Sequence, residues 1–166
     1  TAALAYDADG FVADDQGDID LTTLANLKTV TISGVAGDIN IDQNPNLERV
    51  ILLGHSYGGL LVTAFSGAWD VELPLEIHSI ASPLKGMGGL SSLCEYQPPD
   101  TLSADINLYQ WRTIQALDGA FKDLDYDPQV IEIKDSTVTR LPETYKGNKL
   151  GHNWSISWVA DEINKK

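Results

Sequence analysis

The feature that most constrains the fold of this chain is an apolar run that leads directly into a glycine-rich turn. Residues 48–53 read Glu-Arg-Val-Ile-Leu-Leu, a pattern that predicts a buried strand. Residues 54–58 read Gly-His-Ser-Tyr-Gly, and the apolar segment 59–66 after them predicts a helix. With the strand expected over residues 75–81, this gives strand, turn, helix and strand, which is the unit of a parallel sheet. In this setting a Gly-x-Ser-x-Gly sequence presents its serine, here Ser56, at the carboxyl end of a strand.

The rest of the chain supplies further strands and one more helix. By the same apolar patterning, strands are expected over residues 2–6, 28–33, 75–81, 105–113 and 129–134. A helix is expected over 153–164, and the face that docks on the sheet carries Trp154, Trp158, Val159 and Ile163. We therefore predict an α/β fold with a mostly parallel sheet flanked by helices, as a single domain over residues 1–166.

The composition indicates a folded, soluble protein and excludes several classes of partner. Hydrophobic residues make up 43% and charged residues 21%, as in ordinary globular domains. A net charge of −13 without a cluster of Lys and Arg argues against nucleic-acid binding. No apolar run approaches the roughly 20 residues that cross a bilayer, so stable membrane insertion is not expected. The one cysteine, Cys94, is interpreted as a small buried hydrophobe. The chain starts at Thr1 rather than Met, so an upstream segment is expected to have been removed, and secretion is favoured over a cytoplasmic location.

An internal repeat before the turn raises a different hypothesis, a noncatalytic binding module. Residues 17–34 match residues 37–54 at a spacing of 20, which resembles leucine-rich or β-solenoid repeats. A solenoid generally needs at least three copies to bury a continuous core. Two neighbouring parallel strands, over 28–33 and 49–54, explain the match as well.

The acidic start of the chain bears on the same hypothesis. Asp7, Asp9 and Gly10 are similar to part of a calcium-binding loop. Ala5 and Gln16 stand at the first and last positions, where such a loop needs acids. A solvated acidic loop is therefore the favoured interpretation, and no metal site is predicted.

From residue 48 to the C-terminus the chain resembles the α/β-hydrolase family, particularly its compact lipase and esterase members. The resemblance rests on the turn around Ser56 and on residues 80–84, Ile-Ala-Ser-Pro-Leu, which are similar to the small-residue segment with a proline in lipase-like members. It implies a serine hydrolase that cleaves a small-molecule carboxylic ester through an acyl-enzyme, with no cofactor. Because only 55 residues precede Ser56, the fold would be a minimal α/β-hydrolase with a shortened N-terminal part. A lapsed hydrolase that keeps the fold without turnover is a further alternative.

A serine hydroxyl needs a base to take its proton, and the chain holds three histidines. His55 adjoins the serine and is expected to point away from it, while His78 lies inside a predicted strand. Neither position suits a base. The family resemblance points instead to His152, in a loop just before the last helix.

The resemblance also implies an acid that orients His152, placed between the serine and the histidine along the chain. It points to Asp118, which is followed by a glycine and soon by an apolar residue. The same acidic loop holds three alternatives, Asp123, Asp125 and Asp127.

The turn itself is expected to build half of the oxyanion hole. Side chains at Gly54 and Gly58 are expected to collide with the neighbouring strand and helix. The helix N-terminus directs N–H groups at the oxyanion, with Tyr57 N–H as the first donor. The resemblance implies a second donor after an earlier strand, and Phe11 N–H is the candidate.

Residues 82–104, rich in Gly, Ser and Pro, predict a loop over one end of the sheet. This loop is interpreted equally well as a lid or acyl pocket and as a plain structural connection. Met87 and Leu90 are its candidate substrate-binding residues, for an apolar acyl group.

Overall fold

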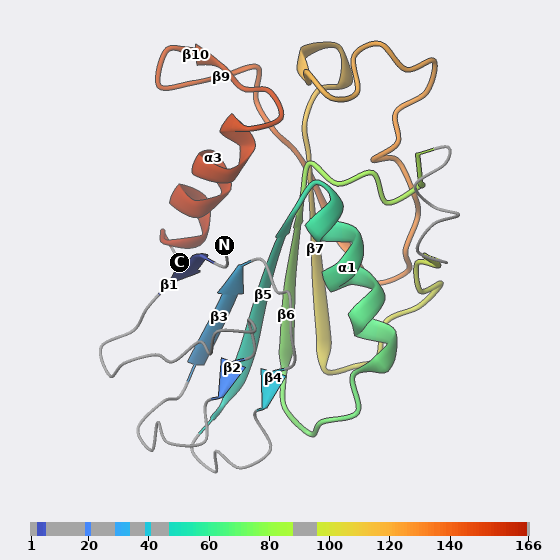
Figure 1. The fold of residues 1–166 in the computed structure, drawn as a ribbon, viewed down its shortest axis with the longest axis vertical. Helices are drawn as coiled ribbons and strands as arrows, with labels where there is room; N and C mark the ends of the chain where they lie inside the picture. Colours follow the sequence, from blue (N-terminus) through green and yellow to red (C-terminus); the bar gives the residue numbers. More distant parts are fainter. Residues whose placement is uncertain are drawn as a thin grey trace.

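A computed structural model describes residues 47–87 and 96–165, and before them strands at 3–5, 19–20, 29–33 and 39–40. Its centre is a six-stranded sheet in the order β1-β3-β5-β6-β7-β8 (Figure 1). The strands are β1 (Ala3–Ala5), β3 (Thr29–Ser33), β5 (Arg49–His55), β6 (Leu75–Ile80), β7 (Ile106–Arg112) and β8 (Thr137–Arg140). Neighbours from β3 to β8 pair in parallel, and β1 pairs antiparallel with β3. The prediction of an α/β fold with a mostly parallel sheet is confirmed.

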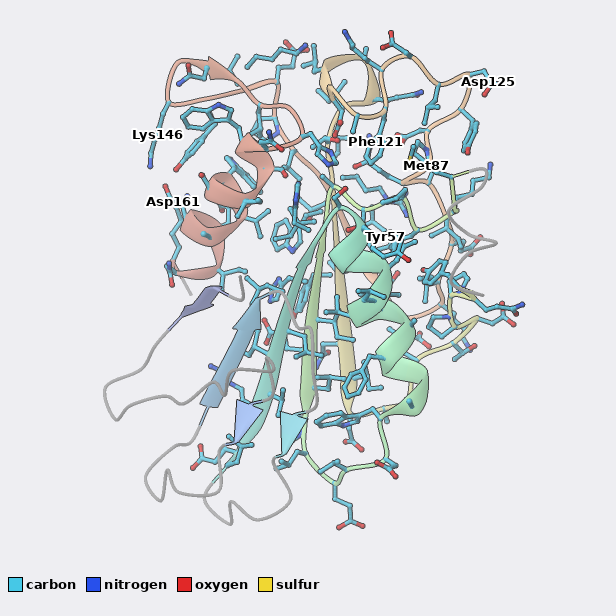
Figure 2. The ribbon with its side chains drawn as sticks, in the orientation of Figure 1. Tyr57, Met87, Phe121, Asp125, Lys146 and Asp161 are labelled. Carbon is cyan, nitrogen blue, oxygen red and sulfur yellow. The ribbon has the colours of Figure 1, made fainter. Side chains whose placement is uncertain are left out.

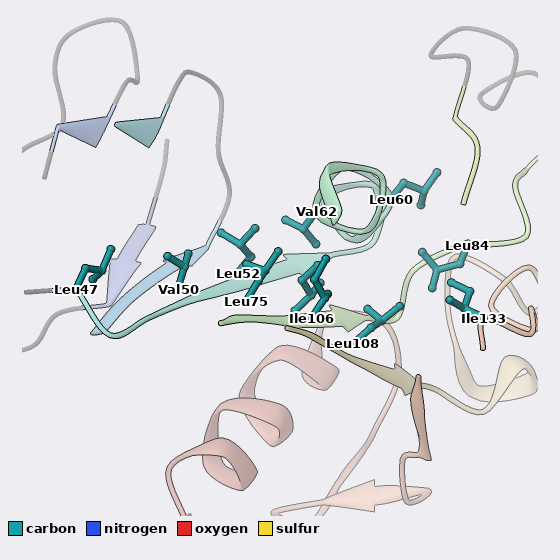
Figure 3. Close-up of a cluster of buried hydrophobic side chains, with 11 residues drawn as sticks. Leu47, Val50, Leu52, Leu60, Val62, Leu75, Leu84, Ile106, Leu108 and Ile133 are labelled. Atoms are coloured by element: carbon teal, nitrogen blue, oxygen red, sulfur yellow. The ribbon is translucent and has the colours of Figure 1, made fainter. Parts of the chain in front are cut away.

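Two helices flank this sheet. Helix α1 (Tyr57–Phe65) connects β5 to β6, as parallel neighbours require, and helix α3 (Trp154–Ile163) lies near the end of the chain. Figure 3 shows α1 and α3 on opposite faces of the sheet. Two short 3-10 helices, η1 (Ser66–Ala68) and η2 (Gln115–Leu117), follow α1 and β7. Among the described residues, no helix is long and apolar enough to cross a bilayer.

The larger apolar core lies between the sheet and α1. Because side chains alternate along a strand, every second residue of β5, β6 and β7 points to this face. Figure 3 shows the cluster, which includes Val50, Leu52, Leu75, Ile77, Ile106 and Leu108 from the strands and Leu60 and Val62 from α1. Full burial of such a side chain stabilises the fold by roughly 1.5–3 kcal/mol. Packing within this cluster therefore holds α1 against the sheet.

A second, smaller core holds α3 on the opposite face. Val159 is fully buried there, and Trp158 and Ile163 pack against the same cluster. The prediction of a docking face is therefore correct at these three positions. It is wrong at Trp154, which is 43% exposed, because the helix begins at this residue, beyond the cluster that buries Val159.

A small hairpin precedes α3 and is fastened to it. Its strands are β9 (Thr144–Tyr145) and β10 (Asn148–Lys149). Tyr145 donates a hydrogen bond to Asp161 of α3, and Lys146 Nζ lies 2.9 Å from Asp161 Oδ2 (Figure 2). The loop between hairpin and helix is thus held at both ends.

The internal repeat appears as strands that pair with their own counterparts. The β3–β5 register runs from Thr29 opposite Arg49 to Ser33 opposite Leu53. Two further short strands, β2 (Ile19–Asp20) and β4 (Ile39–Asn40), also pair in parallel at a separation of 20 residues. The expected parallel pairing of the strands over 28–33 and 49–54 is confirmed.

One predicted strand is wrong. Residues 129–134 form no strand, and the last strand of the sheet is β8. Ile133 is instead 3% exposed in the core near α1, and Ile131 O accepts a hydrogen bond from Arg112 Nη2 at 2.5 Å. The apolar residues of this segment pack their side chains into the core. Its backbone does not pair with a strand of the sheet.

Candidate active site

The carboxyl ends of β5, β6 and β7 meet at one edge of the sheet, where parallel α/β folds place their ligands. Ser56 follows β5, Ala81 follows β6 and Thr113 follows β7. Figure 2 shows Tyr57 and Phe121 at this same end of the molecule. The predicted site residues in the described part of the chain therefore gather at the expected edge.

Ser56 sits on a strained turn between β5 and α1. Its φ of 54° and ψ of −120° lie in a region that costs a non-glycine residue roughly 1–3 kcal/mol. The turn is held because Ser56 N–H donates to Ile80 O at 2.8 Å and Ser56 O accepts from Gly59 N–H at 3.1 Å. Ala81, at the end of β6, also has a positive φ, of 46°. Ser56 and Ala81 are two of the four described non-glycine residues with positive φ; the others, Asp135 and Lys146, lie elsewhere.

The turn depends on two glycines, only one of which was predicted. A Cβ at Gly54 would lie 2.3 Å from Gly58 O, so the close packing of strand on helix needs glycine there. Gly58 has open space around a Cβ, so the prediction of a collision is wrong at that position. The second crowded position is Gly59, where a Cβ would lie 1.7 Å from Ser82 Oγ. The first turn of α1 therefore packs directly against the small residues that follow β6.

His152 and Asp118 form a hydrogen-bonded pair. His152 Nδ1 lies 3.0 Å from Asp118 Oδ1 and 3.1 Å from Oδ2. Asp118 is fully buried, while the His152 side chain is 15% exposed. The loop that carries His152 packs closely against the loop that carries Asp118. This close approach requires Gly151, because a Cβ there would lie 2.8 Å from Leu117 O. Phe121 packs edge-on against the His152 ring, with centroids 5.0 Å apart.

Two further donors keep Asp118 ionised inside the protein. Burial by itself would raise the pKa of Asp118, but hydrogen bonds from His152, Thr113 and the Ala120 N–H outweigh it, so the pKa lies below its ordinary value. Thr113 Oγ1 donates to Asp118 Oδ2 at 2.5 Å, and Ala120 N–H donates to Oδ1 at 2.8 Å. Asp118 is therefore a buried carboxylate, held charged by fixed donors.

Behind Asp118 lies a polar network that the sequence reasoning missed. Gln129, 1% exposed, accepts from Thr113 N–H at 2.8 Å and donates to Thr113 O at 3.1 Å. Its amide also donates to Asp127 Oδ1 at 3.0 Å, and Arg140 Nη1 lies 3.2 Å from Asp127 Oδ2. Of the alternative acids, Asp127 thus belongs to this supporting network. The sequence holds no local signal for this network, because it joins Gln129 to Thr113, 16 residues earlier.

His55 makes a contact that its place in the sequence did not indicate. Its Nε2 lies 3.1 Å from the carbonyl oxygen of His152, and the two ring centroids are 4.6 Å apart. Burial, followed by the nearby His152, lowers the pKa of His55, so its ring is neutral at neutral pH. In the described ranges, no hydrogen bond joins the Ser56 hydroxyl to either imidazole.

The segment after β6 is tied to the loop that carries Asp118. Lys85 N–H donates to Pro128 O at 2.8 Å, and the Tyr126 hydroxyl donates to Gly86 O at 3.1 Å. Met87, partly buried, comes directly after these contacts and lies at the same end of the molecule as Tyr57 in Figure 2. A separate cavity of about 500 Å³ is lined by Arg112, residues 130–136 and Val138, and none of the predicted site residues line it.

Several predictions lie outside the described residues. They are the second oxyanion donor Phe11, the substrate contact Leu90, the cysteine Cys94 and the calcium-like residues Asp7, Asp9 and Gly10. Across the ranges that are described, no group of three or more His, Cys, Asp or Glu side chains is arranged to hold a metal ion.

Comparison of the chain with protein-family models, curated proteins and solved structures finds no match. The resemblance to α/β-hydrolases thus stays a prediction. Any function must be argued from the geometry of this edge of the sheet.

Proposed function

We propose that this chain is a serine hydrolase that cleaves a carboxylic ester through an acyl-enzyme intermediate. The observation that carries the proposal is the hydrogen bond between His152 Nδ1 and the buried Asp118. The His152 ring also contacts the ring of His55, the residue before Ser56. With the Nδ1 proton directed at Asp118, a neutral imidazole has its lone pair on Nε2. That nitrogen is the one that would accept the Ser56 proton.

In the proposed reaction Ser56 Oγ attacks the acyl carbon while His152 Nε2 takes the hydroxyl proton. The tetrahedral intermediate collapses, the bond to the alcohol oxygen breaks, and the alcohol leaves with the proton from His152. Water then attacks the acyl-enzyme with His152 again as base, which releases the carboxylic acid and restores Ser56. Asp118 stays ionised and stabilises the imidazolium, a role that its lowered pKa supports.

The N-terminus of α1 is the proposed oxyanion site. The first N–H groups of a helix point out of its end, and the helix dipole is positive there. Tyr57 N–H, the first of α1, is the proposed donor. Phe11 N–H is the proposed second donor, whose loss would lower the rate by about 100-fold or more.

An apolar acyl group is the proposed substrate feature, with Met87 and Leu90 as its contacts. Met87 is supported by its position after Gly86, on a segment anchored to the 113–128 loop. Leu90 belongs to the same sequence segment. A small-molecule ester is the proposed partner.

The test is mass spectrometry after reaction with a fluorophosphonate, together with turnover of p-nitrophenyl butyrate. We expect one phosphonyl adduct on Ser56 of the wild-type chain and none on Ser56→Ala, with turnover reduced by about 1,000-fold or more because the nucleophile is gone. Ser157→Ala is the matched control, since Ser157 is an exposed serine on α3, and it should label and turn over as the wild type does.

Two outcomes would contradict the proposal. Labelling that survives in Ser56→Ala would place the reactive group elsewhere. A folded wild-type protein that never labels would favour one of the other classes. Melting that depends on calcium would then indicate a binding module, and melting without a calcium response would indicate a lapsed hydrolase.

A further inference from the structure

His55 connects the two ends of the proposed active site. It is the last residue of β5 and directly precedes Ser56, whereas His152 lies 97 residues later. The His55 Nε2–H donates to His152 O at 3.1 Å, and the rings contact each other at 4.6 Å between centroids. One side chain on the nucleophile turn therefore holds the main chain of the proposed base.

The other contacts of His152 cannot do the same. Ser155 Oγ also donates to His152 O, at 2.5 Å, but it lies only three residues away and fixes the loop relative to its own helix. Asp118 fixes the ring at Nδ1, and Phe121 packs on its edge, both from the loop after β7. Only His55, of these four, ties His152 to the strand that carries Ser56.

We infer that His55 is a positioning residue, which sets the distance and angle between His152 and Ser56 through its hydrogen bond to the His152 carbonyl. This inference rests on the proposed hydrolase function. Proton transfer requires the two side chains within hydrogen-bond reach, and a displacement of the base raises the barrier of the chemical step. Because the His152 carbonyl already accepts hydrogen bonds from His55 and Ser155, we expect the effect in kcat and not in KM.

The experiment compares two substitutions of similar length. Gln can present an N–H near the place of His55 Nε2, whereas Met fills a similar volume without a donor. Loss of one net hydrogen bond, about 1–1.4 kcal/mol, corresponds to roughly fivefold to tenfold in rate. With p-nitrophenyl butyrate we expect His55→Met to lower kcat about tenfold, KM to change less than about twofold, and His55→Gln to keep kcat within about threefold.

Thermal melting and fluorophosphonate labelling of Ser56 accompany the kinetics. Equal kcat values for His55→Met and the wild type, both folded and labelled, would overturn the inference and leave the proposed function standing. Equal losses in His55→Met and His55→Gln would also overturn it, since the donor would then not matter. A folded wild-type chain that never labels would overturn the proposed function and this inference with it.

Discussion

Two histidines of this chain each bond a carboxylate, but they differ in burial and in the use of the second ring nitrogen. His78 on β6 is 1% exposed, with Nε2 2.7 Å from Glu76 Oε1. Its Nδ1 accepts a hydrogen bond from Trp111 Nε1 at 2.9 Å, and its ring stacks on Tyr109. Both of its ring nitrogens therefore have a hydrogen-bond partner within the protein.

The His152 pair has the opposite arrangement. Here the carboxylate, Asp118, is fully buried and the imidazole is 15% exposed, whereas Glu76 is 24% exposed in front of a buried His78. A general base needs a carboxylate behind it and one nitrogen able to reach substrate. The two pairs therefore differ in the feature that the proposed general base requires, because only in the His152 pair is the imidazole the outer member.

The largest expected effect separates these two histidines by activity. His152→Gln removes the proposed base, so turnover of p-nitrophenyl butyrate by the folded variant should fall by about 1,000-fold or more. His78→Gln keeps a donor toward Glu76 but leaves Trp111 Nε1–H without its acceptor, which should lower stability by roughly 1–3 kcal/mol. Its folded fraction should turn over at the wild-type rate. Equal activity losses in two folded variants would break the comparison.

A smaller effect is expected behind the carboxylate. Thr113→Val keeps the shape of the side chain and removes the 2.5 Å donor to Asp118 Oδ2. Hydrogen bonds to charged groups are worth about 1.5–3 kcal/mol, so kcat should fall about tenfold or more because Asp118 loses a donor that holds its carboxylate in place behind His152. Thr137→Val, at an exposed position on β8, is the matched control and should leave kcat unchanged. Identical kcat values for the two variants would show that Asp118 does not depend on Thr113.

The local parts of this site could be predicted from sequence, because they depend on neighbours along the chain. The strand, the turn at Ser56 and helix α1 follow from an apolar run, two glycines and a second apolar run. The crowding at Gly59 could not be predicted, because it comes from Ser82, which follows the neighbouring strand β6. Residues 129–134 have a strand-like pattern, but whether they join the sheet depends on tertiary packing.

The long-range contacts needed either a resemblance or the structure. Asp118 and His152 were paired by resemblance to a family, and the fold brings them to 3.0 Å. Neither a resemblance nor a local pattern predicts the bond from His55 to His152, because it joins residues 97 positions apart. The Gln129 amide reaches Thr113 because the loop between them folds back on itself, and no local pattern encodes that path.

The smallest expected effect is a pH dependence of stability in two windows. The lowered pKa of Asp118 contributes stability that is present above its unfolded value of about 3.9 and is lost as pH falls through the lower folded pKa. The lowered pKa of His55 acts earlier, because the folded state resists protonation and loses stability as pH falls below about 6.5. Melting temperatures from pH 8 to 3 should therefore fall less between pH 6.5 and 5 in His55→Gln, and less below about pH 4 in Asp118→Asn, by a few degrees in each case. If the melting temperatures of the wild type, His55→Gln and Asp118→Asn change with pH in the same way, neither His55 nor Asp118 has a lowered pKa in the folded protein. Asp118 would then lack the lowered pKa that supports its role as the ionised partner of His152.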